Sequence, residues 1–155
     1  MESTSPTLYF AYGSNLWLDQ MHRRCPGNNY ISIGILRDWK WFICEYGYAN
    51  VIESPGDIVY GFVYTLTPSD EEKLDGYEHV PENYVKQIHP VELVGDGLVE
   101  KNVDGLVYVD IHRVVEGTIR QEYIVRMNHA IQDAEEKGVP KDYVEKYLRP
   151  FIPVL

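Results

Sequence analysis

The sequence contains only two cysteines, Cys25 and Cys44, in 155 residues. Two cysteines cannot build a disulfide framework, and these two do not form the CxxC pair of a zinc or redox site. We therefore expect a reducing, cytoplasmic location. Cys25 follows one histidine and two arginines at 22–24, whose charges would favour a thiolate, although a surface thiol at a helix end is the simpler interpretation.

Basic residues are also scarce. Lys and Arg together number 14 against 24 Asp and Glu, which gives a formal net charge of −10. Binding to nucleic acid or to an anionic membrane surface depends on clustered Lys and Arg, so we expect neither partner. The chain also lacks a signal-peptide pattern and an apolar run of transmembrane length, so we expect no leader and no membrane segment. A small anionic substrate is compatible with this charge because it responds to local hydrogen-bond donors.

The common sequence signatures of metal and nucleotide sites are absent as well. The five histidines show neither HExxH nor any other paired spacing of metal ligands, so we expect no metal site. No glycine-rich phosphate loop and no GxSxG nucleophile turn occurs. These absences exclude the usual zinc hydrolases, nucleotide-binding enzymes and serine hydrolases.

The composition is nevertheless that of a folded protein. Hydrophobic residues make up 45% of the chain, a share typical of globular proteins. This length suffices to bury a core. We expect a single domain over residues 1–155, in which residues 1–7, rich in Ser, Thr and Pro, form a disordered lead-in.

Hydrophobic periodicity predicts an α+β fold. A short helix is expected between Leu16 and Pro26, and most strands should form hairpins separated by single helices. This order indicates a β-barrel with helices on its outside. The predicted strands are 8–11, 30–44, 51–53, 58–66, 84–94 and 103–111, and the later helices are 68–78, 119–137 and 141–148.

Several predicted boundaries rest on local signals. Thr67 is expected to be the N-cap of a helix with Pro68 in its first turn, and Gly138 the C-cap of another. The Ser-Pro-Gly-Asp segment at 54–57 predicts a turn between two paired strands. Gly95 and the two residues after it predict a second hairpin turn.

The first candidate for chemistry is the Gly-Ser-Asn turn at 13–15, where an apolar strand runs directly into a helical pattern. Glycine at a strand end can adopt positive φ and lets a ligand approach the backbone. A turn that opens a helix also gathers N–H donors, which can hold a carboxylate or a developing oxyanion. An ordinary turn with Ser14 or Asn15 as N-cap is the simpler interpretation.

The second candidate is Glu78, between a predicted helix and the strand that opens at Tyr84. The 13 tyrosines of the chain suit a half-polar cavity. A glutamate in such a cavity has a raised pKa and can act as a general base near neutrality. A surface acid is the simpler interpretation of this segment alone, as it is for Asp75 and Glu82. His79 is a candidate for the rim of the cavity.

Taken together, these segments resemble the motifs of the γ-glutamylcyclotransferases. Residues 9–16, YFAYGSNL, are similar to the first motif of that family. Residues 74–78 match the Leu-Asp-x-x-Glu segment that carries its catalytic glutamate. Similarity to the central hairpin at 53–61 and to the segment at 138–143 extends the resemblance over nearly the whole chain.

The resemblance implies a small mixed, mostly antiparallel β-barrel flanked by helices. It also implies a lyase that converts a γ-glutamyl amino acid or amine into 5-oxoproline and the free amine without a cofactor. Glu78 would be catalytic, and the turn would bind either the oxyanion or the α-carboxylate of the substrate. The implied substrate-binding residues are Tyr12, Gly13, Ser14, Asn15, Leu16, Tyr84, Tyr108 and Tyr123, with core packing as the alternative role of the last three.

Two other functions stay open at this point. One is a cyclotransferase that trims γ-glutamyl groups from a specialised-metabolite or glutathione-derived conjugate. The other is a module that binds γ-glutamyl ligands without turnover. In each case the expected partner is a small γ-glutamyl molecule, and the chain is expected to be a monomer or a homodimer.

Overall fold

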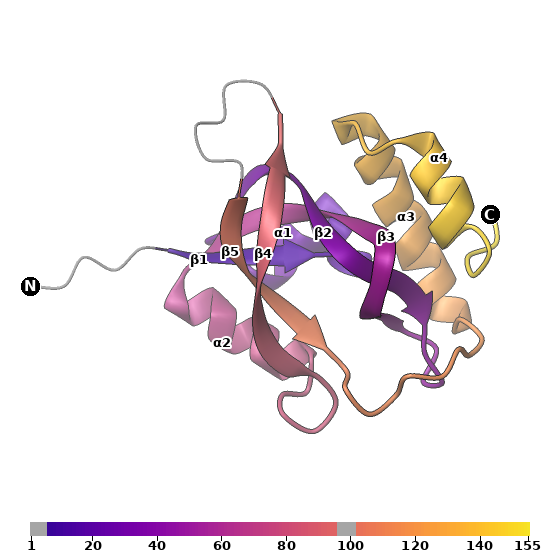
Figure 1. The fold of residues 1–155 in the computed structure, drawn as a ribbon. Helices are drawn as coiled ribbons and strands as arrows, with labels where there is room; N and C mark the ends of the chain where they lie inside the picture. Colours follow the sequence, from indigo (N-terminus) through magenta and orange to yellow (C-terminus); the bar gives the residue numbers. More distant parts are fainter. Residues whose placement is uncertain (1–5, 96–101) are drawn as a thin grey trace, which may run out of the picture.

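The computed structural model describes residues 6–95 and 102–155. Within these ranges five strands close into a barrel in the order β1-β3-β2-β4-β5 (Figure 1). Every neighbouring pair is antiparallel except β1 and β5, which run parallel with Tyr9 opposite Leu106. The predicted α+β fold, a mixed and mostly antiparallel barrel, is therefore confirmed. The strands are β1 (Thr7–Ala11), β2 (Asn29–Ile43), β3 (Ala49–Leu66), β4 (Val85–Val94) and β5 (Asn102–Val109).

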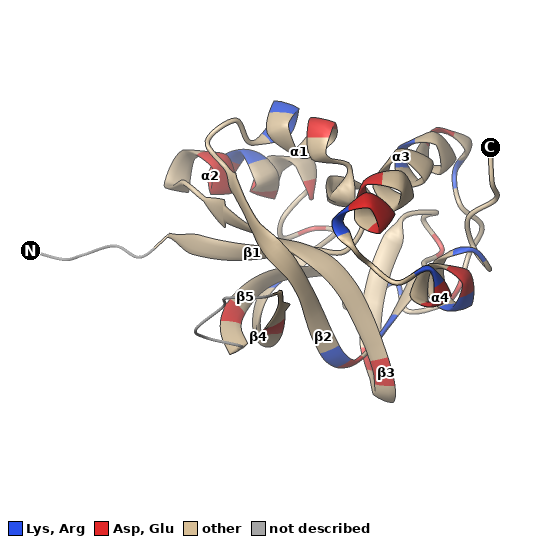
Figure 2. Ribbon diagram, turned by 90° about the horizontal axis from the view of Figure 1, so that it is seen from above, with Lys and Arg blue, Asp and Glu red and all other residues tan. Residues whose placement is uncertain are grey.

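The helices lie outside the barrel, with α1 and α2 on one side and α3 and α4 on another (Figures 1 and 2). Thr67 caps α2 as predicted, because its hydroxyl accepts a hydrogen bond from the Asp70 N–H at 3.0 Å. Gly138 ends α3 in the left-handed conformation with φ +117°. Among the described helices, none combines the length and the apolar composition of a membrane span. The helical segments are η1 (Ser14–Leu16), α1 (Leu18–Arg24), α2 (Pro68–Tyr77), α3 (Gln121–Lys137), α4 (Lys141–Tyr143) and the π-helical turn η2 (Val144–Leu148).

The predicted turn at 54–57 is wrong as a strand boundary. Both flanking segments belong to the single strand β3, and both pair with β2. Arg37 lies opposite Ile58 and Trp39 opposite Glu53, so the four residues 54–57 bulge out opposite Asp38 alone. The Gly56 N–H donates to the Asp38 carboxylate at 2.9 Å. The turn residues therefore leave the hydrogen-bonded ladder, but the strand continues beyond them.

The true end of the β2–β3 hairpin lies at residues 44–48. The Cys44 N–H donates to the Tyr48 carbonyl at 3.0 Å, and Gly47 closes the turn with φ +85°. We call residues 44–48 the hairpin tip. The segment before α3 packs against it, since Glu116 forms a bridge with Cys44 and the Arg120 N–H donates to the Gly47 carbonyl at 3.3 Å. The hairpin tip and the start of α3 are thus held together.

Two smaller expectations need correction. Thr7, predicted to lie in the disordered lead-in, begins β1 and pairs with Leu66, whereas residues 1–5 lie outside the described residues. Cys25 is fully buried rather than a surface thiol. Burial raises the pKa of its thiol to about 11, which also excludes the thiolate alternative. The predicted turn after Gly95 falls on residues outside the described ranges.

The core connects the barrel to the strand-to-helix turn at its edge. Phe10, Trp41 and Phe62 are fully buried, and the burial of each such side chain stabilises the fold by about 1.5–3 kcal/mol. The Trp41 indole N–H donates to the Tyr12 carbonyl at 2.9 Å. A residue of the predicted substrate-binding turn is therefore fixed to the centre of the core.

Candidate active site

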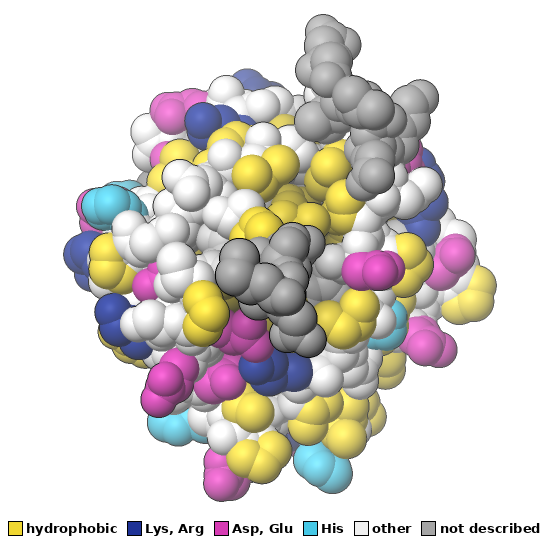
Figure 3. Space-filling view, turned by 90° about the vertical axis from the view of Figure 1, so that its left-hand side faces the viewer, with side chains coloured by type: hydrophobic (Ala, Val, Ile, Leu, Met, Phe, Trp, Pro, Cys, Tyr) yellow, Lys and Arg dark blue, Asp and Glu magenta, His cyan; other side chains and the backbone are white. Residues whose placement is uncertain are grey.

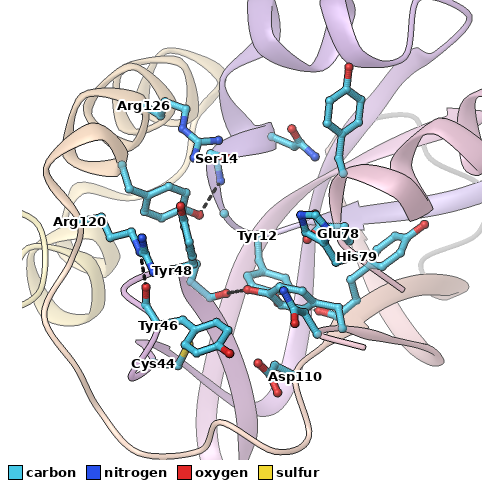
Figure 4. Close-up of a pocket in the computed structure, with 18 of the residues that line it drawn as sticks. Tyr12, Ser14, Cys44, Tyr46, Tyr48, Glu78, His79, Asp110, Arg120 and Arg126 are labelled. Atoms are coloured by element: carbon cyan, nitrogen blue, oxygen red, sulfur yellow. Dashed lines mark hydrogen bonds between the residues drawn. The ribbon is translucent and has the colours of Figure 1, made fainter. Parts of the chain in front are cut away.

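A cavity of about 320 Å³ opens where six segments meet. These segments are the end of β1 with the turn after it, the end of α1, the hairpin tip, the connection from α2 to β4, the end of β5, and the start of α3 (Figure 4). Volumes from about 300 Å³ upward are typical of small-molecule sites. The lining residues are Tyr9, Tyr12, Gly13, Ser14, Asn15, Arg24, Cys44, Tyr46, Tyr48, Ala49, Tyr77, Glu78, His79, Asn83, Tyr84, Tyr108, Asp110, Arg120, Tyr123 and Arg126.

Eight of the nine residues predicted for the site line this cavity. The exception is Leu16, which is 2% exposed and belongs to the hydrophobic core. Its N–H is already used, since it donates to the Gly13 carbonyl at 3.0 Å. The motif therefore continues into the core after Asn15, because the chain turns inward there as η1. His79 also lines the cavity, as expected for a rim residue.

Glu78 follows the last residue of α2, and its N–H donates to the Leu74 carbonyl at 2.9 Å. His79 then adopts φ +51°, so the helix cannot continue. The Glu78 side chain is half-buried and faces the cavity, where no described residue donates a hydrogen bond to its carboxylate. Burial raises the pKa of Glu78 to about 7, although the positive charges of Arg24 and Arg126 oppose this shift.

Gly13 is required for a different reason from the one expected. Its φ of −113° is open to any residue, so the expected left-handed conformation is wrong. A Cβ atom at this position would lie 2.9 Å from the Tyr123 hydroxyl and 3.2 Å from the Ala49 Cβ. Glycine is thus needed because the backbone passes close to two walls of the cavity.

The turn lines the cavity with backbone N–H groups that are not all used within the protein. The Ser14 N–H donates to the Tyr123 hydroxyl at 3.2 Å. Among the described residues, the N–H groups of Gly13 and Asn15 have no acceptor. Backbone donors at such a turn can hold a carboxylate or an oxyanion.

The side chains of the turn support its shape instead of capping a helix. The amide of Gln20, 3% exposed, donates to the Ser14 hydroxyl at 2.8 Å and to the Asn15 side-chain oxygen at 2.9 Å. The Asn15 amide donates to the Tyr9 hydroxyl at 3.0 Å. The first N–H of α1 is accepted by Asp133 of α3 at 2.9 Å. The alternative of an ordinary Ser or Asn N-cap is therefore excluded.

The predicted tyrosines form walls whose hydroxyl groups are held in place. Tyr12 donates to the Tyr108 carbonyl at 2.6 Å, and Tyr84 donates to the Ala49 carbonyl at 2.8 Å. Tyr108 donates to Asp75 at 2.6 Å, and Asp75 is not among the residues that line the cavity. Burial raises the pKa of Tyr123 to about 12 and those of Tyr12 and Tyr84 well above their usual range. All of these hydroxyls are therefore protonated at neutral pH.

Three arginines of the cavity were missed by sequence reasoning: Arg24, Arg120 and Arg126. Arg126 lies three residues after Tyr123, so helical spacing alone would have placed it on the same face of α3. Arg24 stacks on Tyr77, with 4.6 Å between its guanidinium carbon and the ring centroid. No local signal marked either Arg24 or Arg120. They give the cavity positive charge in a protein whose net charge is −10.

A second hollow lies between the start of β1 and the β4–β5 pair, on the face shown in Figure 3. Its walls include the apolar residues Pro6, Leu8, Ile88, Pro90 and Val103. Asp104 is the single titratable residue among its described lining residues. Because it brings no acid and base together, this hollow is a weaker candidate for chemistry.

Comparisons with known proteins agree with one another on the family. The model of the family described as γ-glutamyl cyclotransferase, AIG2-like, matches residues 9–126, which include both the turn and Glu78. A γ-glutamylcyclotransferase from Bos taurus is 30% identical over 90% of this chain and 76% of its own length. A Mus musculus protein of the same name is 35% identical over 47% of this chain and 44% of its own length. A solved structure named γ-glutamyl cyclotransferase is 27% identical over 92% of this chain and 86% of that chain, with a TM-score of 0.78.

Proposed function

The chain belongs to the γ-glutamyl cyclotransferase, AIG2-like, family of enzymes, and on that premise we propose that it converts a γ-glutamyl amino acid or amine into 5-oxoproline and the free amine. The observation that carries the proposal is the position of Glu78. Its carboxylate, with a pKa of about 7, faces the same cavity as the free N–H groups of the turn at 13–15. A base near neutrality and a set of oxyanion donors are the two groups that such a reaction needs.

The proposed reaction is an attack of the substrate on itself. The α-amino nitrogen forms a bond to the γ-carbonyl carbon, and the bond from that carbon to the leaving nitrogen breaks. Because nucleophile and electrophile are tethered in one molecule, orientation supplies much of the acceleration. The enclosed tyrosine walls at Tyr12, Tyr84 and Tyr123 would hold the γ-glutamyl chain in the curled shape that brings the two atoms together.

Glu78 would move the proton in both halves of the reaction. An ammonium group cannot attack, so the carboxylate first removes a proton from it. The protonated Glu78 then donates that proton to the departing nitrogen, and the regenerated carboxylate takes the second proton from the new ring nitrogen. The released amine accepts this second proton and leaves as an ammonium ion, so Glu78 ends the reaction as a carboxylate. A pKa of about 7 suits both steps, since neither protonation state is strongly favoured at neutral pH.

The turn would stabilise the charge that develops during the attack. Negative charge gathers on the γ-carbonyl oxygen as the ring closes. The N–H groups of Gly13 and Asn15, without acceptors among the described residues, can donate to that oxygen. Arg24, which lies near Glu78 and 3.5 Å from the Asn15 side-chain oxygen, is then available for the α-carboxylate.

The test is a direct assay for 5-oxoproline. The purified protein is incubated separately with γ-glutamyl-alanine, ε-(γ-glutamyl)-lysine and glutathione, and the release of 5-oxoproline and of the amine is quantified. Equal amounts of both products from at least one substrate would support the proposal. Tight binding of these compounds without any 5-oxoproline would instead favour a binding module and overturn the proposed reaction.

A further inference from the structure

The arginines of the cavity differ in whether a carboxylate pairs with them. Arg126 is paired, since its guanidinium donates to Glu122 at 3.0 and 3.1 Å. Among the described residues, Arg24 and Arg120 form no salt bridge. Arg24 stacks on Tyr77, the residue before Glu78, so it lies on the side of the cavity where the reacting atoms would sit. The proposed reaction assigns no negatively charged group of the substrate to Arg120.

Arg120 is held in place by the hairpin tip. Its backbone N–H donates to the Gly47 carbonyl at 3.3 Å, and its Nε donates to the Tyr46 carbonyl at 2.5 Å (Figure 4). Its guanidinium carbon lies 5.0 Å from the centroid of the Tyr48 ring. A Cβ on Gly47 would come within 2.6 Å of the Arg120 Cγ, so the tip packs directly on the side chain. The residue is exposed, yet its guanidinium group is oriented before any ligand binds.

The contacts of Arg120 leave its outer nitrogens for a ligand. Nε is used by the Tyr46 carbonyl, whereas neither terminal nitrogen has an acceptor among the described residues. The two terminal nitrogens of a guanidinium match the two oxygens of a carboxylate in spacing and in plane. Figure 4 shows Arg120 across the cavity from Glu78. A substrate with its γ-carbonyl near Glu78 would extend its leaving group toward Arg120.

We propose that Arg120 is a specificity-determining residue that binds a carboxylate on the leaving group, so that the enzyme favours γ-glutamyl α-amino acids over uncharged γ-glutamyl amines. This inference rests on the proposed function. A γ-glutamyl amino acid carries two carboxylates, and the cavity carries two arginines without a carboxylate partner, Arg24 and Arg120. We therefore assign the α-carboxylate of the γ-glutamyl group to Arg24 and the carboxylate of the leaving group to Arg120, which lies farther from the reacting atoms.

The experiment compares γ-glutamyl-alanine with γ-glutamyl-alaninamide, which differ in the charge of one group. For the wild type, kcat/KM should be about tenfold higher for the acid, the value of one charge-assisted hydrogen-bond pair at an exposed site. Arg120→Gln should remove this preference by raising KM for the acid, with little change for the amide. Arg120→Lys should retain part of it because the charge stays but the paired geometry is lost. Arg37→Gln, which removes an exposed charge that pairs with Glu92, is the matched control and should keep the wild-type ratio.

The outcomes separate this inference from the proposed function. If the wild type releases 5-oxoproline from both compounds with equal kcat/KM, the carboxylate subsite is refuted while the reaction stands. The subsite is also refuted if Arg120→Gln lowers kcat/KM equally for both, because that result indicates a purely structural role at the hairpin tip. Release of 5-oxoproline from neither compound would refute the preference for γ-glutamyl α-amino acids, whereas the reaction itself would be overturned only if glutathione and ε-(γ-glutamyl)-lysine also released none.

Discussion

Glu78→Gln should abolish turnover and at the same time stabilise the protein at alkaline pH. Glutamine keeps the size of the side chain but can neither accept the substrate proton nor carry a charge. Loss of general base catalysis should lower kcat by about 100- to 10,000-fold. Ligand binding should persist, because the tyrosine walls and the turn do not depend on the charge of Glu78.

The stability effect follows from the pKa shift. In the folded protein burial raises the pKa of Glu78 from its ordinary 4.5 to about 7. Between these two values the unfolded chain has already lost the proton that the folded protein retains, so folding becomes less favourable as the pH rises through this window. A shift of this size corresponds to at most about 3–4 kcal/mol. Because the side chain opens into a solvent-accessible cavity, the expected penalty above pH 7 is about 1–2 kcal/mol.

The assay is urea unfolding of the wild type and of the variant at pH 5 and at pH 8. Glu78→Gln should be more stable than the wild type by about 1–2 kcal/mol at pH 8 and by well under 1 kcal/mol at pH 5. Glu82→Gln, which changes an exposed acid in the same connection, is the control. Its effect on the free energy of unfolding should be the same at pH 5 and at pH 8. An equal effect of Glu78→Gln at both pH values would refute the buried, proton-retaining acid, and more than a few per cent residual turnover would refute its role as base.

Three further outcomes are expected. The kcat/KM of the wild type should rise with pH through about 7 as Glu78 ionises. Arg24→Gln should move this rise to higher pH, because the Arg24 charge lowers the pKa of Glu78. A pH profile of kcat/KM for both proteins checks this, and a rise at the same pH in both would contradict it. Gly13→Val should raise KM strongly, since its side chain meets the Tyr123 hydroxyl; a normal KM in steady-state kinetics would show that the turn does not bind substrate. Gln20→Leu should cost about 1–3 kcal/mol of stability, because it leaves buried partners of the turn without hydrogen bonds; a free energy of unfolding equal to that of the wild type would argue against the support assigned to Gln20.

Signals in neighbouring residues predicted much of the fold correctly. Thr67 followed by Pro68, and Gly138 followed by Pro140, placed the start of α2 and the end of α3 because capping depends on adjacent residues. The segment at 54–57 was wrongly predicted to separate two strands, for a related reason. Its turn chemistry is real, but the same residues also suit a bulge, and only the pairing of both flanks with β2 distinguishes the two.

The candidate site was likewise only partly predictable from the sequence. The motif around Gly13 and the glutamate at 78 could be selected from the chain alone, because each combines rare residue types over a few positions. Their convergence on one cavity is a property of the closed barrel, which brings the end of β1 next to the end of α2.

The pattern of residues along the chain was sufficient for the kind of fold, its caps, the turn and the acid, since these depend on contacts between near neighbours. Contacts between residues far apart in the sequence decided the remaining features of the site. Cys25 is buried because α2 covers it. Residue 13 must be glycine because the Tyr123 hydroxyl lies beside it. Arg120 faces the cavity because a hairpin tip 74 residues earlier in the chain holds its Nε. Such contacts leave no periodic trace in the sequence, since they form only when the barrel closes.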